Sequence, residues 1–309
     1  TGRETMNERN ILVVAHAGRD DTVAAARRVV DALRGAGARP VLAADDSLDL
    51  RAVDSHFADV DVLGDTVQQD DLELAIVLGG DGTILRAAEL VRGCAAPVLG
   101  INMGHVGFLA EIDRDDMDAA MRRVIDRDYE VEERLALSVR VKDVDGEVVY
   151  ETFALNEATV EKASRERMIE VVLEIDGRPL SSFGCDGMVI STPTGSTAYN
   201  FSAGGPVIWP SVEAIAVIPL SAHALFAKPL VVSPDAAVAI EMLEGTSGSG
   251  ILWCDGRRSH DLPPGARVVV RRSSRPVRLA RLHPTEFTDR LVRKFQLPVA
   301  GWRGQGVTT

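Results

Sequence analysis

The chain has 309 residues, of which 46% are hydrophobic and 26% are charged, and its formal net charge is −12. This length is enough for two domains with cores of their own. The acidic balance argues against a general nucleic-acid or membrane-surface binder. No apolar run approaches the roughly 18 residues of a membrane span, and we recognise no signal peptide. The cysteines are isolated, which fits reduced thiols, so we expect a cytoplasmic protein with no nucleic-acid or membrane partner.

The first elements of the chain predict a parallel sheet. Residues 10–16 indicate a buried strand, and residues 39–44 indicate a second one. Residues 24–33 between them have the spacing of an amphipathic helix. Strand, helix and strand in this order form a βα unit of a parallel sheet. The acidic residues 45–71 are weakly periodic, and a short helix and a strand there remain undecided.

The next segment combines a strand, a glycine-rich turn and a helix. Residues 75–78 are a short apolar run, residues 79–83 read Gly-Gly-Asp-Gly-Thr, and residues 84–90 carry apolar side chains at helical spacing. The first amides of a helix lack internal partners, and glycines let a phosphate approach the backbone without meeting a Cβ. This geometry predicts a phosphate-binding turn, although the P-loop and dinucleotide fingerprints are both absent.

Asp81 is the unusual residue of this turn. A carboxylate repels bare phosphate, so in a phosphate site it would hold a cation or accept a proton from a hydroxyl group. Arg86, one turn into the helix, could return positive charge to the same place. The alternative is a plain strand-to-helix turn in which the glycines serve the geometry and Asp81 caps the helix.

Two different patterns follow along the chain. Residues 97–102 predict another buried strand and residues 115–125 an amphipathic helix, which completes an α/β domain near residue 130. From residue 134 the pattern changes to alternation, and Asp-Gly turns separate several short strands. This predicts an all-β, sandwich-like domain, followed by a last amphipathic helix over residues 285–295.

Polar segments of the all-β part are candidate ligand contacts. Asn156 and Glu157 place an amide beside a carboxylate, which can bind both edges of an amide-bearing ring or two ribose hydroxyls, although a polar turn explains them equally well. Residues 192–199 present hydroxyls and amides without net charge, which suits ribose, pyrophosphate or adenine, and Tyr199 could stack on a base. Arg167, in a charged loop, could reach a phosphate, and the alternative is a solvated ion pair within that loop.

Four motifs in this order resemble one enzyme family. The Gly-Gly-Asp-Gly-Thr turn resembles the signature of NAD kinases, of diacylglycerol and sphingosine kinases and, more loosely, of 6-phosphofructokinases. Residues 155–157 (Leu-Asn-Glu), residues 184–206 with STPTGSTAY and SAGGP, and residues 254–256 (Cys-Asp-Gly) resemble the other motifs of NAD kinases. The match is to bacterial NAD kinases over most of the chain, and it leaves residues 45–71 without a place.

The resemblance implies a fold and its boundaries. Residues 1–132 would form an α/β domain that is Rossmann-like, of the phosphofructokinase and diacylglycerol-kinase type. Residues 133–280 would form the all-β, sandwich-like NAD-binding domain, and residues 281–309 would pack back on the first domain. Edge strands in the all-β domain, together with the habit of the family, lead us to expect a homodimer or homotetramer.

The resemblance also implies a reaction: the γ-phosphoryl group of ATP, or a phosphoryl group of polyphosphate, passes to the 2′-hydroxyl of the adenosine ribose of NAD and gives NADP. Mg²⁺ or another divalent metal would neutralise charge, with no metal ligand assigned to a protein side chain. Asp81 would be the catalytic residue that accepts the hydroxyl proton. The predicted nucleotide-binding residues are Gly79, Gly80, Gly82, Thr83, Arg86, Asn156, Glu157, Arg167, Asp186, Thr197, Ala198, Tyr199, Asn200, Phe201 and Ser202.

The sequence leaves open the choice between ATP and polyphosphate, and two alternatives belong to other functional classes. A lipid kinase with the same turn would need an apolar groove or a basic membrane face, and it leaves STPTGSTAY unexplained. A non-catalytic NAD(P)-binding regulatory protein on this fold would be marked by the loss of Asp81, which is present.

Overall fold

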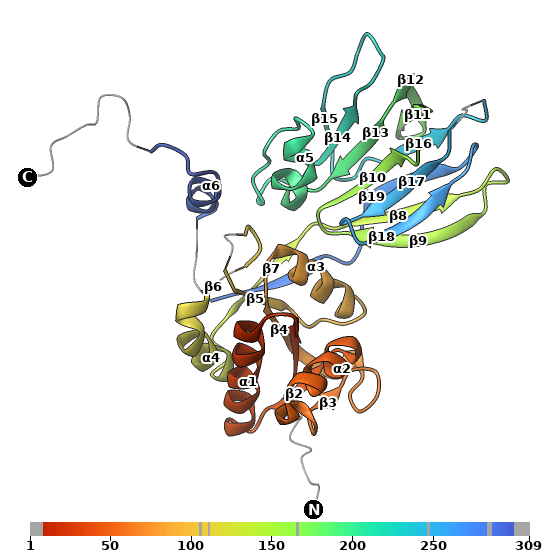
Figure 1. The fold of residues 1–309 in the computed structure, drawn as a ribbon. Helices are drawn as coiled ribbons and strands as arrows, with labels where there is room; N and C mark the ends of the chain where they lie inside the picture. Colours follow the sequence, from red (N-terminus) through yellow and green to blue (C-terminus); the bar gives the residue numbers. More distant parts are fainter. Residues whose placement is uncertain are drawn as a thin grey trace, which may run out of the picture. The chain divides into compact units, whose positions relative to one another are not determined.

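The computed structural model describes residues 9–104, 107–110, 112–164, 167–245, 248–282 and 286–299. These residues form two compact units, each with a core of its own (Figure 1). Unit 1 contains the described residues up to Glu133 and those from Arg278 onward, and unit 2 is the segment Arg134–Val277. The predicted fold class, an α/β domain plus an all-β sandwich-like domain, is confirmed.

Unit 1 is built on one eight-stranded sheet. Its strands are β1 (Asn10–Ala15), β2 (Arg39–Leu42), β3 (Asp61–Val62), β4 (Leu72–Leu78), β5 (Val98–Asn102), β6 (Ile112–Asp113), β7 (Glu130–Arg134) and β20 (Val277–Arg281). Their order in space is β3-β2-β1-β4-β5-β20-β7, with β6 beside β5. The pairings of β1 to β6, and that of β20 with β5, are parallel. The central strands are almost wholly buried, which explains their continuous apolar runs.

Within the described ranges, unit 1 contains five helices. They are α1 (Asp20–Gly35), α2 (Ala44–Val53), α3 (Asp81–Leu90), α4 (Met117–Ile125) and α6 (Phe287–Phe295). Short 3-10 turns are η1 (Ser55–Phe57), η2 (Gln69–Asp71) and η3 (Arg114–Asp116), and η3 leads directly into α4. α1 and α4 contact each other and share one core with the sheet (Figure 1). Their apolar faces are therefore the ones that the helical spacing predicts.

The acidic segment that the sequence left undecided is ordered as α2, η1, β3 and η2. Its weak periodicity has a simple cause in α2. The buried residues of this helix are Asp46, Ser47 and Leu50, so two of the three are polar. A hydrophobic pattern cannot reveal a helix whose buried face is made largely of polar side chains.

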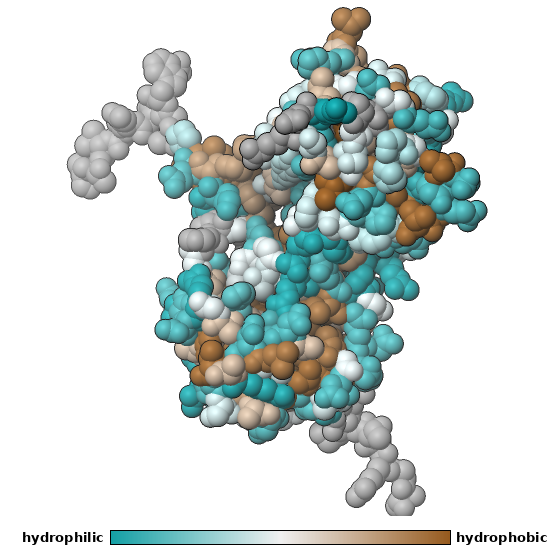
Figure 2. All heavy atoms as spheres, turned by 45° about the vertical axis from the view of Figure 1, so that its right-hand side comes forward, coloured by the Kyte–Doolittle hydropathy of each residue, from teal (hydrophilic) through white to brown (hydrophobic). Residues whose placement is uncertain are grey.

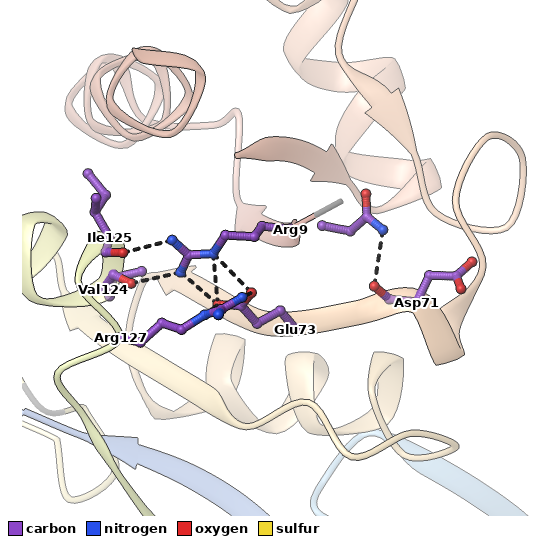
Figure 3. A network of polar contacts seen from close by, with 7 residues as sticks. Arg9, Asp71, Glu73, Val124, Ile125 and Arg127 are labelled. Carbon is purple, nitrogen blue, oxygen red and sulfur yellow. Dashed lines mark hydrogen bonds and ion pairs between the residues drawn. The ribbon is translucent and has the colours of Figure 1, made fainter. Parts of the chain in front are cut away.

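One ion network joins three elements at the amino-terminal edge of the sheet (Figure 3). Arg9, directly before β1, binds Glu73 of β4 through Nη2 at 2.7 Å and Nε at 3.0 Å. It also donates to the carbonyl oxygens of Val124 (3.0 Å) and Ile125 (2.7 Å) in the last turn of α4. Burial alone would raise the pKa of Glu73, but hydrogen bonds from Arg9 and Arg127 lower it to about 2.

The last helix contacts the segment that follows β5. The ring of Phe108 lies 6.0 Å from that of Phe287 and 5.8 Å from that of Phe295, measured between centroids. Arg290 donates to the carbonyl oxygens of Phe108 and Ala110, each at 2.9 Å. α6 begins at Phe287, and the predicted start at residue 285 lies outside the described residues.

Unit 2 consists of two six-stranded antiparallel sheets that share one core. The order of the first sheet is β15-β14-β13-β10-β17-β18, and that of the second is β12-β11-β16-β19-β8-β9. The strands are β8 (Leu137–Lys142), β9 (Val148–Ala154), β10 (Glu157–Lys162), β11 (Ile169–Ile175), β12 (Arg178–Cys185), β13 (Gly187–Ser191), β14 (Ile215–Leu220), β15 (Leu230–Val232), β16 (Val238–Met242), β17 (Gly250–Cys254), β18 (Arg258–Leu262) and β19 (Arg267–Arg272). Two short helical turns, η4 (Thr194–Thr197) and α5 (Tyr199–Ser202), follow β13.

On the face that Figure 2 shows, apolar residues occur in separate patches among hydrophilic ones. None of the helices within the described ranges is long and apolar enough to cross a membrane.

Candidate functional site

The glycine-rich turn lies at the carboxyl end of β4, the sheet edge at which open α/β sheets bind ligands. α3 begins at Asp81, and Gly80 is its N-cap residue, which excludes the alternative that Asp81 caps this helix. A Cβ at Gly80 or Gly82 would meet no atom, so the backbone of the turn is open to approach. Thr83, the last residue of the motif, donates its N–H to Gly80 at 3.0 Å. The first amides of a helix are suited to a phosphate group.

The Asp81 carboxylate is oriented by the segment that follows β5. Its Oδ2 accepts the N–H of Phe108 at 2.9 Å, and its Oδ1 accepts the N–H of Leu109 at 3.1 Å. An ionised carboxylate has about four acceptor sites, so further sites remain for a ligand. Asp81 is half-buried, fixed in direction, and still able to accept another hydrogen bond.

Arg86 is paired with a carboxylate that the sequence did not single out. Its Nη1 lies 2.6 Å from Oδ1 of Asp46, whose side chain is 6% exposed. Oδ2 of Asp46 accepts the N–H of Ala15 at 3.3 Å. Burial raises the pKa of Asp46, and the hydrogen bond from Arg86 opposes this shift. Ala15 pairs with Leu78, directly before the turn, so the predicted positive charge is at this edge but is held by Asp46.

In unit 2, two of the sequence motifs form one structure. The carboxylate of Asp255 accepts three consecutive backbone N–H groups, those of Leu155 at 2.9 Å, Asn156 at 2.7 Å and Glu157 at 3.3 Å. Arg258 binds the same carboxylate at 2.7 Å. β10 and β17 are neighbours, which brings the start of one strand to the end of the other. No role for the Cys-Asp-Gly motif could be predicted, because this pairing joins residues about a hundred positions apart.

Glu157 is buried without full hydrogen bonding. It is 7% exposed, and its Oε2 has no hydrogen-bond partner among the residues that the structure describes. Burial, followed by the charge of Asp255, raises the pKa of Glu157 to about 8, and the N–H of Tyr199 opposes the shift. Buried polar atoms are normally satisfied, so this open oxygen is a candidate ligand contact.

The loop after β13 packs directly on residues 155–157. Thr192 donates its hydroxyl to the carbonyl oxygen of Leu155 at 2.5 Å, and its own N–H binds the carbonyl of Asn156 at 2.9 Å. A Cβ at Gly195 would collide with the backbone of Asn156, so only glycine permits this approach. The structure thus brings together the Leu-Asn-Glu motif and the loop rich in hydroxyl groups.

Asn200 differs from the other residues predicted in this loop. It is fully buried, and its Nδ2 donates to the carbonyl oxygens of Ser196 at 3.0 Å and Pro206 at 2.9 Å. These bonds close the loop on itself and give Asn200 a structural task.

The remaining loop residues are closer to the surface. The hydroxyls of Thr197 and Ser202 donate to carbonyl groups inside the loop, at 3.4 Å and 3.1 Å. Ala198 donates its N–H to Gly195, and Tyr199 and Phe201 are partly exposed. Burial raises the pKa of Tyr199, and nearby carboxylates add to the shift.

Asp186 lies at the other end of the same strand pair. β10 and β13 are antiparallel, with Glu157 opposite Ser191 at one end and Gly187, the neighbour of Asp186, at the other. The two ends of this pairing, at Ser191 and at Gly187, are four residues apart, which is ~14 Å at about 3.4 Å per residue. Asp186 instead forms an ion pair with Lys162 at 2.6 Å, which lowers its pKa. Lys162 is the last residue of β10, and it was not among the predicted residues because nothing in the local sequence distinguishes it.

Two further predictions concern charge. Arg167 is exposed two residues before the start of β11, while Arg165, in the same loop, lies outside the described residues. In the described part of the chain, no group of three or more His, Cys, Asp or Glu side chains could hold a metal ion. The protein therefore shows no side-chain cage for a divalent metal in this part.

Most of the chain matches two family models, and nearly all of it matches proteins of known family. Residues 11–129 match the family described as ATP-NAD kinase N-terminal domain, and residues 155–282 match the ATP-NAD kinase C-terminal domain. The chain is 67% identical to a NAD kinase of Leifsonia xyli subsp. xyli, over 96% of this chain and 97% of that protein. It is 55% identical to NAD kinase 2 of Streptomyces coelicolor, with the same coverage of 96% and 97%.

Solved structures agree in fold. Yeast NADH kinase complexed with NADH has a TM-score of 0.84 at 21% identity, covering 96% of this chain and 90% of that one. A NAD kinase from Archaeoglobus fulgidus in complex with ATP has a TM-score of 0.67 at 25% identity, covering 94% and 98%.

Proposed function

Because the chain belongs to the NAD kinase family, we propose that it transfers the γ-phosphoryl group of ATP to the 2′-hydroxyl of the adenosine ribose of NAD, with Asp81 accepting the hydroxyl proton. It is an enzyme, a phosphotransferase. The geometry of Asp81 is the observation that supports its role. Two backbone amides fix the direction of its carboxylate at the head of α3 and leave acceptor sites for a hydroxyl group.

The donor phosphates would bind the backbone of the Gly79–Thr83 turn. Gly80 and Gly82 leave this backbone uncovered, and the positive end of the α3 dipole favours anions there. Arg86 is held close to the same edge by Asp46. Phosphoryl transfer has a loose transition state. The rate therefore depends mainly on the positions of the attacking and leaving oxygens and on the stabilisation of the phosphoryl charge.

Mg²⁺, or another divalent ion, would enter with ATP as the metal–nucleotide complex. The described residues show no cluster of carboxylates and imidazoles that could hold the ion by itself. Mg²⁺ is commonly bound through one or two carboxylates together with substrate phosphates. When bound, it neutralises charge on the phosphates, and we assign no protein side chain to it.

The NAD-binding residues would be those that surround the open oxygen of Glu157. Asn156 precedes Glu157 in the chain, the N–H of Tyr199 binds the Glu157 carboxyl group, and residues 194–202 form the short helical turns that follow β13. Asn200 would stabilise this loop through its buried hydrogen bonds. Asp186, paired with Lys162 at the far end of β10 and β13, would contact a part of the nucleotide other than the part that Glu157 contacts. Arg167 remains a proposed phosphate contact.

The decisive experiment compares the wild type with Asp81→Asn. Each protein is incubated with NAD, Mg²⁺ and ATP, or with polyphosphate in place of ATP, and NADP is measured with an NADP-specific dehydrogenase. We expect NADP formation to fall by about 10²–10⁴-fold, the usual contribution of a general base. NAD binding, measured by calorimetry, should stay within a few-fold. If binding falls as far as the rate, Asp81 is a ligand anchor and the proposed role is wrong.

The alternatives receive no support. The family match leaves no reason for a lipid acceptor. A purely regulatory protein has no need of an oriented Asp81. A homodimer or homotetramer and a cytoplasmic location stay proposals, supported by the edge strand β15 and by three free cysteines.

A further inference from the structure

Asp255 has used its hydrogen-bonding capacity inside the protein. Its side chain is 1% exposed, and it accepts the N–H groups of Leu155, Asn156 and Glu157 as well as a guanidinium hydrogen bond from Arg258. A carboxylate has about four acceptor sites, so none is left for a ligand. Its role is therefore to hold the backbone of residues 155–157 in place.

The backbone at this point adopts an uncommon conformation. Asp255 has a φ of 55° and Gly256 a φ of 63°, both in the left-handed region. Glycine reaches this region freely, while other L-residues adopt it at a cost in energy. Such a conformation persists where the surrounding structure requires it, often close to a functional site. Here it delivers the carboxylate to three consecutive amides.

Arg258 supports Asp255 from behind. Its guanidinium lies 4.1 Å from the centroid of the Phe153 ring, and the same group binds Asp255 at 2.7 Å. Phe153 belongs to β9, two residues before Leu155. The segment 153–157 is thus attached twice, by a cation–π contact at its start and by three hydrogen bonds at its end.

The charges that face Glu157 come from several elements. Asp255 follows β17, Glu161 lies farther along β10, and the N–H of Tyr199 comes from α5, while Arg258 acts through Asp255. Burial and the charge of Asp255 raise the pKa of Glu157 to about 8. Below this pH the carboxyl group is mainly protonated, and it then carries an O–H donor in addition to acceptor oxygens.

We propose that Asp255 and Arg258 are positioning residues of the NAD site, which fix the backbone of residues 155–157 and keep Glu157 a neutral hydrogen-bond donor toward an acceptor atom of the nucleotide. This inference rests on the proposed role of Asn156 and Glu157 in NAD binding. The open Oε2 of Glu157 is the atom through which such a contact would form. An ionised Glu157 would bring a buried negative charge against a polyanionic ligand, so its ionisation opposes binding.

The test measures NAD affinity by calorimetry, without ATP, from about pH 6.5 to about pH 9.5, because titration of Glu157 falls inside this window. Wild-type affinity should be constant at low pH and should fall toward tenfold per pH unit above about pH 8. Glu157→Gln keeps an uncharged donor, so its affinity should stay within a few-fold of the wild type and lose the alkaline fall. In Asp255→Asn the fall should start at a lower pH, because the neighbouring charge is gone.

Matched variants separate this effect from simple loss of structure. Arg258→Lys retains the charge and should keep the profile near that of the wild type, whereas Arg258→Gln should weaken binding. Asp261→Asn, at an exposed carboxylate of the neighbouring strand β18, is the control and should change nothing. Circular dichroism and thermal denaturation verify the fold of each variant, and Glu157→Gln tests the idea even if Asp255→Asn does not fold.

Two outcomes are distinguishable. If Asn156→Ala and Glu157→Ala bind NAD as tightly as the wild type, the proposed NAD site itself is wrong. If these variants lose NAD but the wild-type affinity does not change between about pH 7 and about pH 9.5, only the donor role of Glu157 is overturned. Weak binding by a folded Glu157→Gln would also overturn it, because the carboxylate would then be the required form.

Discussion

Two aspartates, one in each unit, accept backbone amides in opposite situations. Asp81 at the head of α3 is half-buried and accepts two N–H groups, those of Phe108 and Leu109. Asp255 after β17 is buried and accepts three N–H groups and a guanidinium hydrogen bond from Arg258. The Asp81 carboxylate is oriented and still has free hydrogen-bond acceptor sites, whereas all the acceptor sites of the Asp255 carboxylate are occupied.

The difference teaches how to separate a reacting group from a supporting one. Both residues stand in an Asp-Gly pair of a sequence motif, and the motif alone treats them alike. The number of acceptor sites that remain free distinguishes them, because a saturated carboxylate has no site for a substrate hydroxyl. Removal of Asp81 should therefore reduce the rate, whereas removal of Asp255 should reduce stability and NAD affinity.

The largest expected effect on stability comes from Asp255→Ala. This change leaves three buried amides and the Arg258 guanidinium without their acceptor, and loss of one partner of a buried charge pair costs about 3–5 kcal/mol. Urea denaturation followed by circular dichroism measures the change. Asp81→Ala is the matched variant, with an expected loss of only about 1 kcal/mol. Equal losses in the two variants would remove the distinction between them.

An intermediate effect is expected at Arg86, whose partner Asp46 is buried. Arg86→Met removes the guanidinium that opposes the burial of this carboxylate, which should cost about 1–3 kcal/mol. The pKa of Asp46 is raised in the folded state. The loss of unfolding free energy in Arg86→Met should therefore grow as the pH rises above the unfolded-state pKa of Asp46, because the buried carboxyl group must then ionise without its partner. Asp46→Asn in the same background should recover part of the stability.

The same Arg86→Met variant also tests the donor site. Its KM for ATP should rise while its KM for NAD stays constant, and the reverse pattern would exclude Arg86 from the donor site.

A smaller effect is expected for Asn156→Ala, which removes the side-chain amide of the residue that precedes Glu157 in the chain. A single hydrogen bond contributes about 1–1.5 kcal/mol, so the KM for NAD should rise about tenfold at unchanged kcat and unchanged KM for ATP. Steady-state kinetics with each substrate varied in turn measures the change. A KM for NAD equal to that of the wild type excludes this side chain from the site.

The smallest effect concerns Glu73, a second saturated carboxylate that is partly solvated (Figure 3). Its folded-state pKa is about 2 against an ordinary value of 4.5, so the stabilisation it gives is complete above the unfolded value and is lost as the pH falls toward about 2. Glu73→Gln should flatten this acid limb in thermal denaturation profiles. Arg127→Gln, which keeps the Arg9 contacts, should flatten it less, and an unchanged limb in both would contradict the assignment.

Much of the fold and part of the site could be predicted from the sequence. The strands around the Asp81 turn are continuous apolar runs, and the change to alternation after residue 134 marks the all-β unit. The family resemblance to bacterial NAD kinases is confirmed by relatives that cover nearly the whole chain. These features are local in sequence, and local patterns are what such reasoning can read.

The partners of the site residues could not be predicted, because they are distant in sequence. Asp46 meets Arg86 across forty positions from a helix whose buried face is largely polar. Asp255 meets residues 155–157 only after β10 and β17 pair. The register of β10 and β13 likewise decides that Asp186 stands apart from Glu157. Each case depends on which helices or strands become neighbours in the fold, and local sequence patterns do not reveal this.

The place of β20 in the first sheet has a consequence for how the protein is made. β5 receives β20 as its neighbour, and β20 in turn is beside β7, so the chain leaves unit 1 and returns to it through adjacent strands. A ribosome therefore completes all of unit 2 before it supplies the strand that covers β5. Until then the nascent first unit has an open sheet edge, the kind of surface on which chains aggregate. A released chain that ends shortly before residue 277 should contain all the strands of the second unit and a first unit that lacks β20.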